Sequence, residues 1–258
     1  MSEYLDPSTL REMGLLDVRM ILALAIVALG GVLRGFTGFG AALVIVPVLS
    51  IIFTPREGVP MHTIMELPGI LQLLPTAVRH ADRPTVVPMI LAMVAAIPVG
   101  VLALVTINPE VMRIVISVMV LLMVCLLATN WRYTGPTRLP VSLGAGSVSG
   151  LIHGSTGVGG PAVVAVLMAR DDGTDTTRAN IIAMMGAMIV GGLPIMWAYG
   201  LLTLRVLIVG AIAAPIYFAS IYIGSRFYDG HGQKLHRRVS LIMLALIAGA
   251  TLIAAILK

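Results

Sequence analysis

Apolar runs of similar length recur from one end of this 258-residue chain to the other, and no other feature constrains its fold as strongly. Most of them approach the roughly 20 residues that an α-helix needs to cross the hydrocarbon core of a membrane. Only 11% of the residues are charged, against about 25% in soluble domains, so water would not solvate this chain as a globule. The runs do not alternate apolar with polar residues, as the strands of a membrane β-barrel do. We therefore predict an all-α polytopic membrane protein.

The net charge of +5 does not indicate nucleic-acid binding, because the basic residues lie in short loops between the apolar runs. Loops of this kind carry the signal that orients a membrane protein. Residues 1–17 contain four acidic residues where a secretory signal peptide would carry positive charge. We predict a short interfacial segment there. The single cysteine, Cys125, excludes an intrachain disulfide and a paired-cysteine metal site.

An internal duplication relates the two halves of the chain. At an offset of 119 residues, GGVLRGFTGFGAALVIVPVL falls on SGLIHGSTGVGGPAVVAVLM. The coinciding residues are Gly31, Gly35, Thr37, Gly38 and Gly40 with Gly150, Gly154, Thr156, Gly157 and Gly159. Three apolar runs follow each segment, near 61–78, 85–107 and 111–129, and near 179–199, 204–225 and 239–257. We predict two homologous repeats, about 18–130 and about 139–258, within a single transmembrane domain of residues 18–258.

The first element of each repeat is too long to be one membrane-crossing helix. Residues 18–53 would form a straight helix of roughly 54 Å, whereas the hydrocarbon core is about 30 Å thick. Glycines lie at its centre, where they weaken a helix most, and the same holds for residues 150–160. We predict that each repeat begins with two short helices that meet at an irregular turn inside the membrane. Unpaired backbone at that depth is tolerated only where it lines a cavity.

The charges of the loops favour broken segments that are re-entrant. If all eight segments crossed the membrane, the arginines and lysines other than Arg34 would divide evenly, whereas two re-entrant segments place ten on one side and six on the other. The positive-inside rule then puts both termini outside and the basic loop 226–238 in the cytoplasm. Each repeat keeps three full spans, so the repeats are inverted. Transporters of that architecture bind their substrates near the membrane midplane.

Helices that start inside the membrane direct N–H groups and a positive dipole end at the space before them. We predict such starts near Phe39 and Val158, after glycines that let an anion approach the backbone. Arg34 and His153 are equivalent in the two repeats, and a cation at this depth is usually functional. With the hydroxyl donors, the predicted substrate-binding residues are Arg34, Thr37, Gly38, Phe39, Gly40, His153, Ser155, Thr156, Gly157, Val158 and Gly159.

Each of these features also has a structural interpretation. The glycines could serve close helix packing, and the threonines could bond carbonyls of their own helices. Arg34 could extend to the membrane surface, and His153 could be an ordinary core histidine. Glu66, with His62 one turn earlier, is a candidate proton carrier together with His153. An interfacial ion pair of Glu66 with His62 is an equal alternative.

Two segments also carry a family resemblance. GFTGFGAALVIVPVL and GLIHGSTGVGGPAVVAVL resemble the paired signatures of the sulfite exporter TauE/SafE family, also called the 4-toluene sulfonate uptake permease family. The resemblance covers nearly the whole chain. It implies a multi-pass carrier in the bacterial inner membrane for sulfite, sulfonates or related organic anions, and it supplies no site residues.

The leading hypothesis is a secondary transporter that holds a small anion between the two Gly-rich turns, with proton coupling as an open second layer. A passive anion channel would use the same donors and would not move the anion uphill. We do not expect an enzyme, because HExxH and G-x-S-x-G are absent and Ser155 is too near His153 in the chain to pair with it. A sensor is the remaining alternative. No cofactor or nucleic-acid partner is expected, and a homodimer is one open oligomeric state.

Overall fold

The computed structural model describes residues 17–37, 40–129, 133, 139–170, 172–226, 245–246 and 249–255. The longer helices along these ranges are α2 (Val18–Thr37), α3 (Ala41–Ile52), α4 (Pro55–His80), α5 (Arg83–Thr106), α6 (Pro109–Ala128), α7 (Leu139–Thr156), α8 (Gly160–Leu167), α9 (Thr174–Ala198) and α10 (Leu204–Arg226). Within the described ranges there is no β-strand, so the all-α prediction is confirmed there. The predicted interfacial segment lies outside them, apart from Asp17.

Five helices of the described ranges are long and apolar enough to cross a membrane, namely α2, α5, α6, α9 and α10. The chain is therefore a multi-pass membrane protein, as predicted. The long helices α4 and α7 are not among the five. Glu66 and His62 lie on α4 and His153 lies on α7, and all three side chains are buried. The buried histidines and the buried glutamate thus lie on helices outside that set of five.

The broken segments have one long and one short helix each, so the prediction of two short helices is wrong for the first member of each pair. α2 has 20 residues and α7 has 18, whereas α3 has 12 and α8 has eight. At 1.5 Å per residue, α2 alone reaches about 30 Å. α2 can therefore traverse a membrane, whereas α3 and α8 are long enough to cover only part of its thickness.

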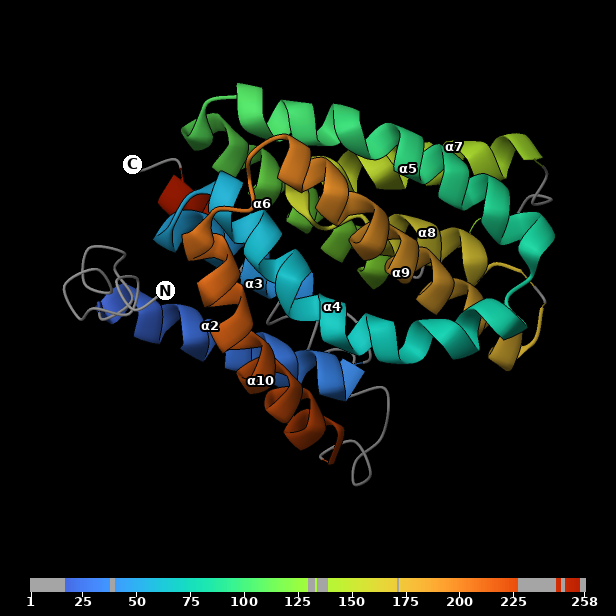
Figure 1. The fold of residues 1–258 in the computed structure, drawn as a ribbon, viewed down its shortest axis with the longest axis horizontal. Helices are drawn as coiled ribbons and strands as arrows, with labels where there is room; N and C mark the ends of the chain where they lie inside the picture. The colour runs from blue at the N-terminus through green and yellow to red at the C-terminus, as the bar shows by residue number, and fades with distance from the viewer. Residues whose placement is uncertain are drawn as a thin grey trace.

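The two long first helices lie against partners from the other half of the chain (Figure 1), and glycines line both contacts. α7 packs on α5, where a Cβ at Gly150 would lie 2.2 Å from the carbonyl oxygen of Met93. α2 packs on α10, where a Cβ at Gly35 would lie 2.1 Å from the carbonyl oxygen of Ile221. Small residues permit this close approach of helix backbones in membranes. The packing interpretation of the repeated glycines therefore holds for these two positions.

The first broken segment, α2 with α3, begins and ends at the same end of the helix bundle. In the α2–α10 seam, Gly31 lies beside Ser220 and Gly35 beside Ile221 and Ser225, so the two helices run parallel. The end of α3 lies near the start of α10, since the guanidinium of Arg205 stacks 5.0 Å from the ring centroid of Phe53. A re-entrant segment follows the same path.

The helix boundaries repeat at the offset found in the sequence. α2 ends at Thr37 and α7 at Thr156, α3 begins at Ala41 and α8 at Gly160, and α4 begins at Pro55 and α9 at Thr174. Each of these three pairs is separated by 119 residues. In Figure 1 the α2–α10 pair lies on one side of the bundle and the α5–α7 pair on the other, with α4 and α9 between them.

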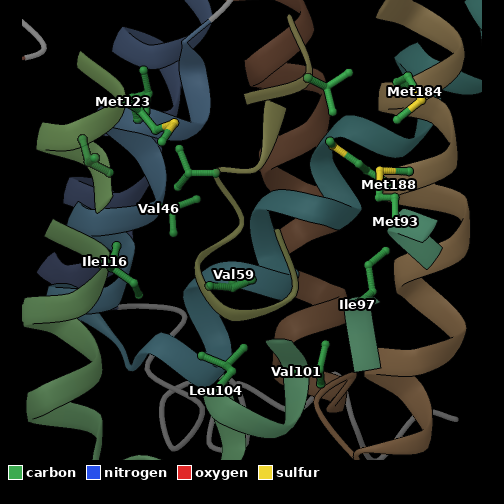
Figure 2. Packing of buried hydrophobic residues seen from close by; sticks show 14 of the residues in the cluster. Val46, Val59, Met93, Ile97, Val101, Leu104, Ile116, Met123, Met184 and Met188 are labelled. Atoms are coloured by element: carbon green, nitrogen blue, oxygen red, sulfur yellow. The ribbon is translucent and has the colours of Figure 1, made fainter. Parts of the chain in front are cut away.

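Buried apolar side chains fill the space between these helices. Figure 2 shows part of the larger cluster, in which Val46 of α3 and Val59 of α4 lie between α6 on one side and Met93 and Met188 on the other. A second cluster joins α2, α3, α4 and α10, and Tyr217 is its largest fully buried member. The short helix α3 contributes to both clusters, which places it between them.

Candidate functional site

The two Gly-rich turns are the centre of the candidate site, and the structure confirms a helix break at each. Gly40 caps the start of α3 with φ 93°, and Gly157 lies between α7 and α8 with φ 71°. Residues with a Cβ adopt this left-handed backbone at a cost. The second helices start at Ala41 and Gly160, two residues after the predicted positions.

Both turns open on one cavity of about 370 Å³. Its lining includes residues around both helix starts, namely Gly40, Ala41, Ala42, Gly157, Val158 and Gly160. The first N–H groups of a helix have no acceptor within that helix, and they carry the positive end of its dipole. Residues at two such ends therefore border the same cavity. Pro161 at the start of α8 lacks one of these N–H groups.

Five polar side chains also line the cavity, namely Arg34, His62, Thr63, Glu66 and His153. They come from α2, α4 and α7, which are distant in the sequence. The structure therefore brings together the arginine, the carboxylate and both histidines that the sequence singled out. The hydroxyl of Thr63 donates a hydrogen bond of 3.0 Å to the carbonyl oxygen of Val59.

Arg34 is bound to two groups of neighbouring helices. Its Nη1 pairs with Oε1 of Glu66 on α4 and donates a hydrogen bond of 2.8 Å to the hydroxyl of Tyr217 on α10. The Tyr217 hydroxyl donates in turn to Glu66 Oε1, at 2.6 Å. Only 21% of the Arg34 side chain and 5% of the Glu66 side chain are exposed. Arg34 thus forms a buried triad with Glu66 and Tyr217 rather than reaching the surface.

Both cavity histidines keep a nitrogen without a hydrogen bond among the described residues. Nε2 of His62 lies 3.5 Å from Glu66 Oε1 and makes no hydrogen bond there. Nε2 of His153 is buried and likewise has no partner in the described part of the chain. Glu66 is the twelfth of the 26 residues of α4, so its contact with His62 occurs at the middle of a helix. That position disfavours the interfacial ion pair.

The predicted hydroxyl donors of the second turn are engaged elsewhere. Thr156 donates to the carbonyl oxygen of Ile152 at 2.7 Å, and Ser155 donates to that of Leu151 at 2.8 Å. Bonds to the own helix are the structural alternative for such residues, and it describes both hydroxyls here. The carbonyl of Gly159 accepts from Ser149 at 2.7 Å. None of these three predicted residues lines the cavity.

The first turn is described only in part. Gly38 and Phe39 lie outside the described residues, as does the side chain of Thr37. Their predicted contribution to substrate binding stays a prediction.

Arginines also hold the outer ends of the two short helices. Arg113 of α6 donates to the carbonyl oxygens of Ser50 at 2.8 Å and Phe53 at 3.2 Å, which places a cation at the negative end of the α3 dipole. After α8, Arg170 bonds Asp172 and donates to Asp82 at 2.8 Å. The hydrogen bond to Asp172 raises the pKa of Arg170 above its ordinary value.

Tyr217 and the apolar side of the cavity were missed by the sequence analysis. Six side chains form that side: Val164, Met168, Ile181, Met185, Met188 and Ile189. Tyr217 sits in an apolar run, where its hydroxyl is the one signal that could have marked it. A buried tyrosine hydroxyl usually has a hydrogen-bond partner, but the sequence does not show which.

Comparison with known proteins yields one match. A family model described as sulfite exporter TauE/SafE matches residues 22–251, nearly the whole chain. Neither a curated protein nor a solved structure shows a match to the chain.

Proposed function

Because the chain belongs to the TauE/SafE sulfite exporter family, we propose that it is a secondary transporter that moves a small organic anion across the bacterial inner membrane. One observation carries the proposal. Two helix starts and the guanidinium of Arg34 meet at a single cavity between helices long enough to span a membrane. Helix N-termini and buried cations are the groups that proteins use for anions at membrane depth.

In this proposal the two halves are inverted repeats, and the cavity lies between them near the membrane midplane. Three pairs of helix boundaries that agree at one offset support the repeat. The exchange of partners, α2 with α10 and α7 with α5, supports a two-fold relation. Rocking of one repeat against the other would open the site to each side in turn. Both termini would lie outside, as the loop charges indicate.

The anion would contact Arg34 and the N–H groups of Ala41 and Ala42 at the start of α3, with the α8 start on the opposite side. His153 would lie beside the anion on the side of the second half. The glycines at 40 and 157 would let the anion approach the backbone, since a side chain at either position would narrow the turn. Glu66 and the two histidines remain the candidates for proton coupling.

The apolar side of the cavity favours an organosulfonate or a related organic anion over sulfite. Met185, Met188 and Ile189 offer no hydrogen bonds to an ion that is polar on every side. A volume of about 370 Å³ falls in the range of pockets for small organic ligands, about 300 to 1,000 Å³. A substrate with a sulfonate head and an apolar body would place the head at Arg34 and the body against these side chains.

The test is uptake of radiolabelled 4-toluenesulfonate and of sulfite into proteoliposomes, with and without an imposed pH gradient. We expect saturable uptake of the sulfonate, and its loss in Arg34→Ala. Arg205→Ala is the matched control, since Arg205 pairs with Glu57 at 3.1 Å and does not line the cavity. Absence of flux for both anions in folded wild-type protein would refute the proposal. Flux that never exceeds equilibrium under any gradient would make the protein a channel.

A further inference from the structure

The Arg34 guanidinium is already neutralised before any substrate arrives. Its Nη1 pairs with Glu66 and donates to Tyr217, and Glu66 is the one carboxylate among the described residues that line the cavity. An anion that binds Arg34 therefore meets a carboxylate on the same guanidinium. Two anions held together in a buried site repel each other strongly.

Displacing Glu66 as a charged group would be costly. A carboxylate that is 5% exposed and has lost its cation is far less stable in the protein interior than the protonated acid, so such a group takes up a proton instead. We propose that Glu66 is a built-in competitor of the substrate for Arg34, and that each monovalent anion which binds brings one proton onto Glu66. This inference rests on the proposed transport function and gives it a coupling mechanism.

Tyr217 is suited to hold Glu66 in both charge states. Its hydroxyl now donates to Glu66 Oε1 at 2.6 Å and accepts from Arg34 at 2.8 Å. A tyrosine hydroxyl can also accept a hydrogen bond from a protonated acid. Tyr217 thus acts as a positioning residue that retains Glu66 when the substrate takes Arg34. It is 1% exposed and belongs to α10, in the other half of the chain.

The titratable groups around Glu66 leave few other sites for this proton. Arg34 reaches it from α2, Tyr217 from α10 and His62 from its own helix, while His153 lines the same cavity from α7. α3 carries no titratable side chain, and the residues of α9 that line the cavity are isoleucines and methionines. His62 is the nearest alternative proton acceptor, 3.5 Å from Glu66 Oε1.

The charge balance makes the mechanism testable. Arg34 with ionised Glu66 has no net charge, and neither has Arg34 with a bound monovalent anion and protonated Glu66. Transport of such an anion would therefore respond to a pH gradient and not to membrane voltage. In Glu66→Gln, Arg34 keeps an uncompensated charge that attracts the anion without a proton. Each anion that this variant transports would move one net negative charge across the membrane, so its transport would respond to voltage.

The first measurement is binding of 4-toluenesulfonate to purified protein between about pH 5 and 8. For one proton per anion, the Kd of the wild type rises about tenfold for each unit of pH. We expect the Kd of Glu66→Gln to be independent of pH. The glutamine side chain has the shape of glutamate and can still accept a hydrogen bond from Arg34. Glu57→Gln is the matched control, because Glu57 is on the same helix and pairs with Arg205 outside the cavity. We expect the Kd of Glu57→Gln to depend on pH as that of the wild type does.

The second measurement is uptake into proteoliposomes under a pH gradient or a potassium diffusion potential. We expect Glu66→Gln to lose pH-driven accumulation and gain voltage dependence, and Tyr217→Phe to show a shallower pH slope of binding. An unaltered slope in Glu66→Gln, or a slope lost only in His62→Gln, would overturn the assignment of the proton to Glu66. If the wild type binds the anion and Glu66→Gln behaves like it, only the coupling mechanism fails. If the wild type binds neither anion, the proposed function fails and takes this inference with it.

Discussion

The two sides of the cavity share a backbone plan and differ in chemistry. Arg34, His62 and Glu66 line it from the first half, and the residues 119 positions later are His153, Ile181 and Met185, which line it too. The helices that carry them have matching boundaries. Equivalent positions thus hold an ionic cluster on one side and mostly apolar side chains on the other. Helices with matching boundaries thus border the cavity on both sides, while its charged side chains lie on one side only.

The largest expected effect is a loss of folding free energy in Glu66→Ala, compared with Met185→Ala at the equivalent position. Removing the carboxylate leaves Arg34 buried without its counter-ion, which costs about 3–5 kcal/mol of folding free energy. Removing Met185, which already borders open space, costs less than about 2 kcal/mol because few contacts are lost. Both losses are obtained by measuring the free energy of unfolding of each variant in mixed micelles. Equal losses would show that the two sides do not differ in their electrostatic role.

The second contrast tests whether the scaffold itself is shared. A Cβ at Gly31 would lie 2.8 Å from the carbonyl oxygen of Tyr217, and one at Gly150 would lie 2.2 Å from that of Met93. Overpacking of this kind costs about 1–3 kcal/mol, so Gly31→Ala and Gly150→Ala both lower the melting temperature. Gly144→Ala is the control, since nothing lies within 4 Å of its Cβ. If only one of the two substitutions lowered the melting temperature, the two halves would not be structurally equivalent.

The smallest effect concerns the outer end of α8. Arg170→Gln removes the contacts with Asp82 and Asp172, whose side chains are 28% and 20% exposed, and lowers stability by at most about 1 kcal/mol. Hydrogen bonding raises the pKa of Arg170. Its contribution is therefore complete at neutral pH and is lost only as pH rises through that elevated value. The difference between Arg170→Gln and wild type stays constant from about pH 6 to 9 and shrinks with salt. A clear change within that pH range would contradict the assignment.

The polar part of the candidate site was largely visible in the sequence. Glycines at matched positions inside over-long apolar runs indicate a helix break, because a straight helix would exceed the membrane. Arg34, His153 and Glu66 stand out because a polar group in an apolar run needs a reason. The structure places all three at the cavity next to Gly40 and Gly157.

Other parts of the site could not be predicted. The hydroxyls of Ser155 and Thr156 could donate either to a bound anion or to carbonyls of their own helix, and in the structure both donate to carbonyls of α7. Tyr217 lies 151 residues from Glu66. Their contact depends on how closely α4 and α10 approach each other, where Gly69 lies beside Phe218 and Gly210 beside Ile64, and no local pattern encodes that approach.

The sequence by itself determined the membrane class and the positions of the two helix breaks, because these follow from hydropathy, chain length and glycine spacing. Only the tertiary structure decided that Arg34 is paired rather than free, with Glu66 and Tyr217 as its partners. It also decided that the opposite side of the cavity is apolar. Those outcomes depend on which faces of α2, α4, α9 and α10 meet. Helix packing among many apolar residues sets those faces, and the order of residues along one helix does not.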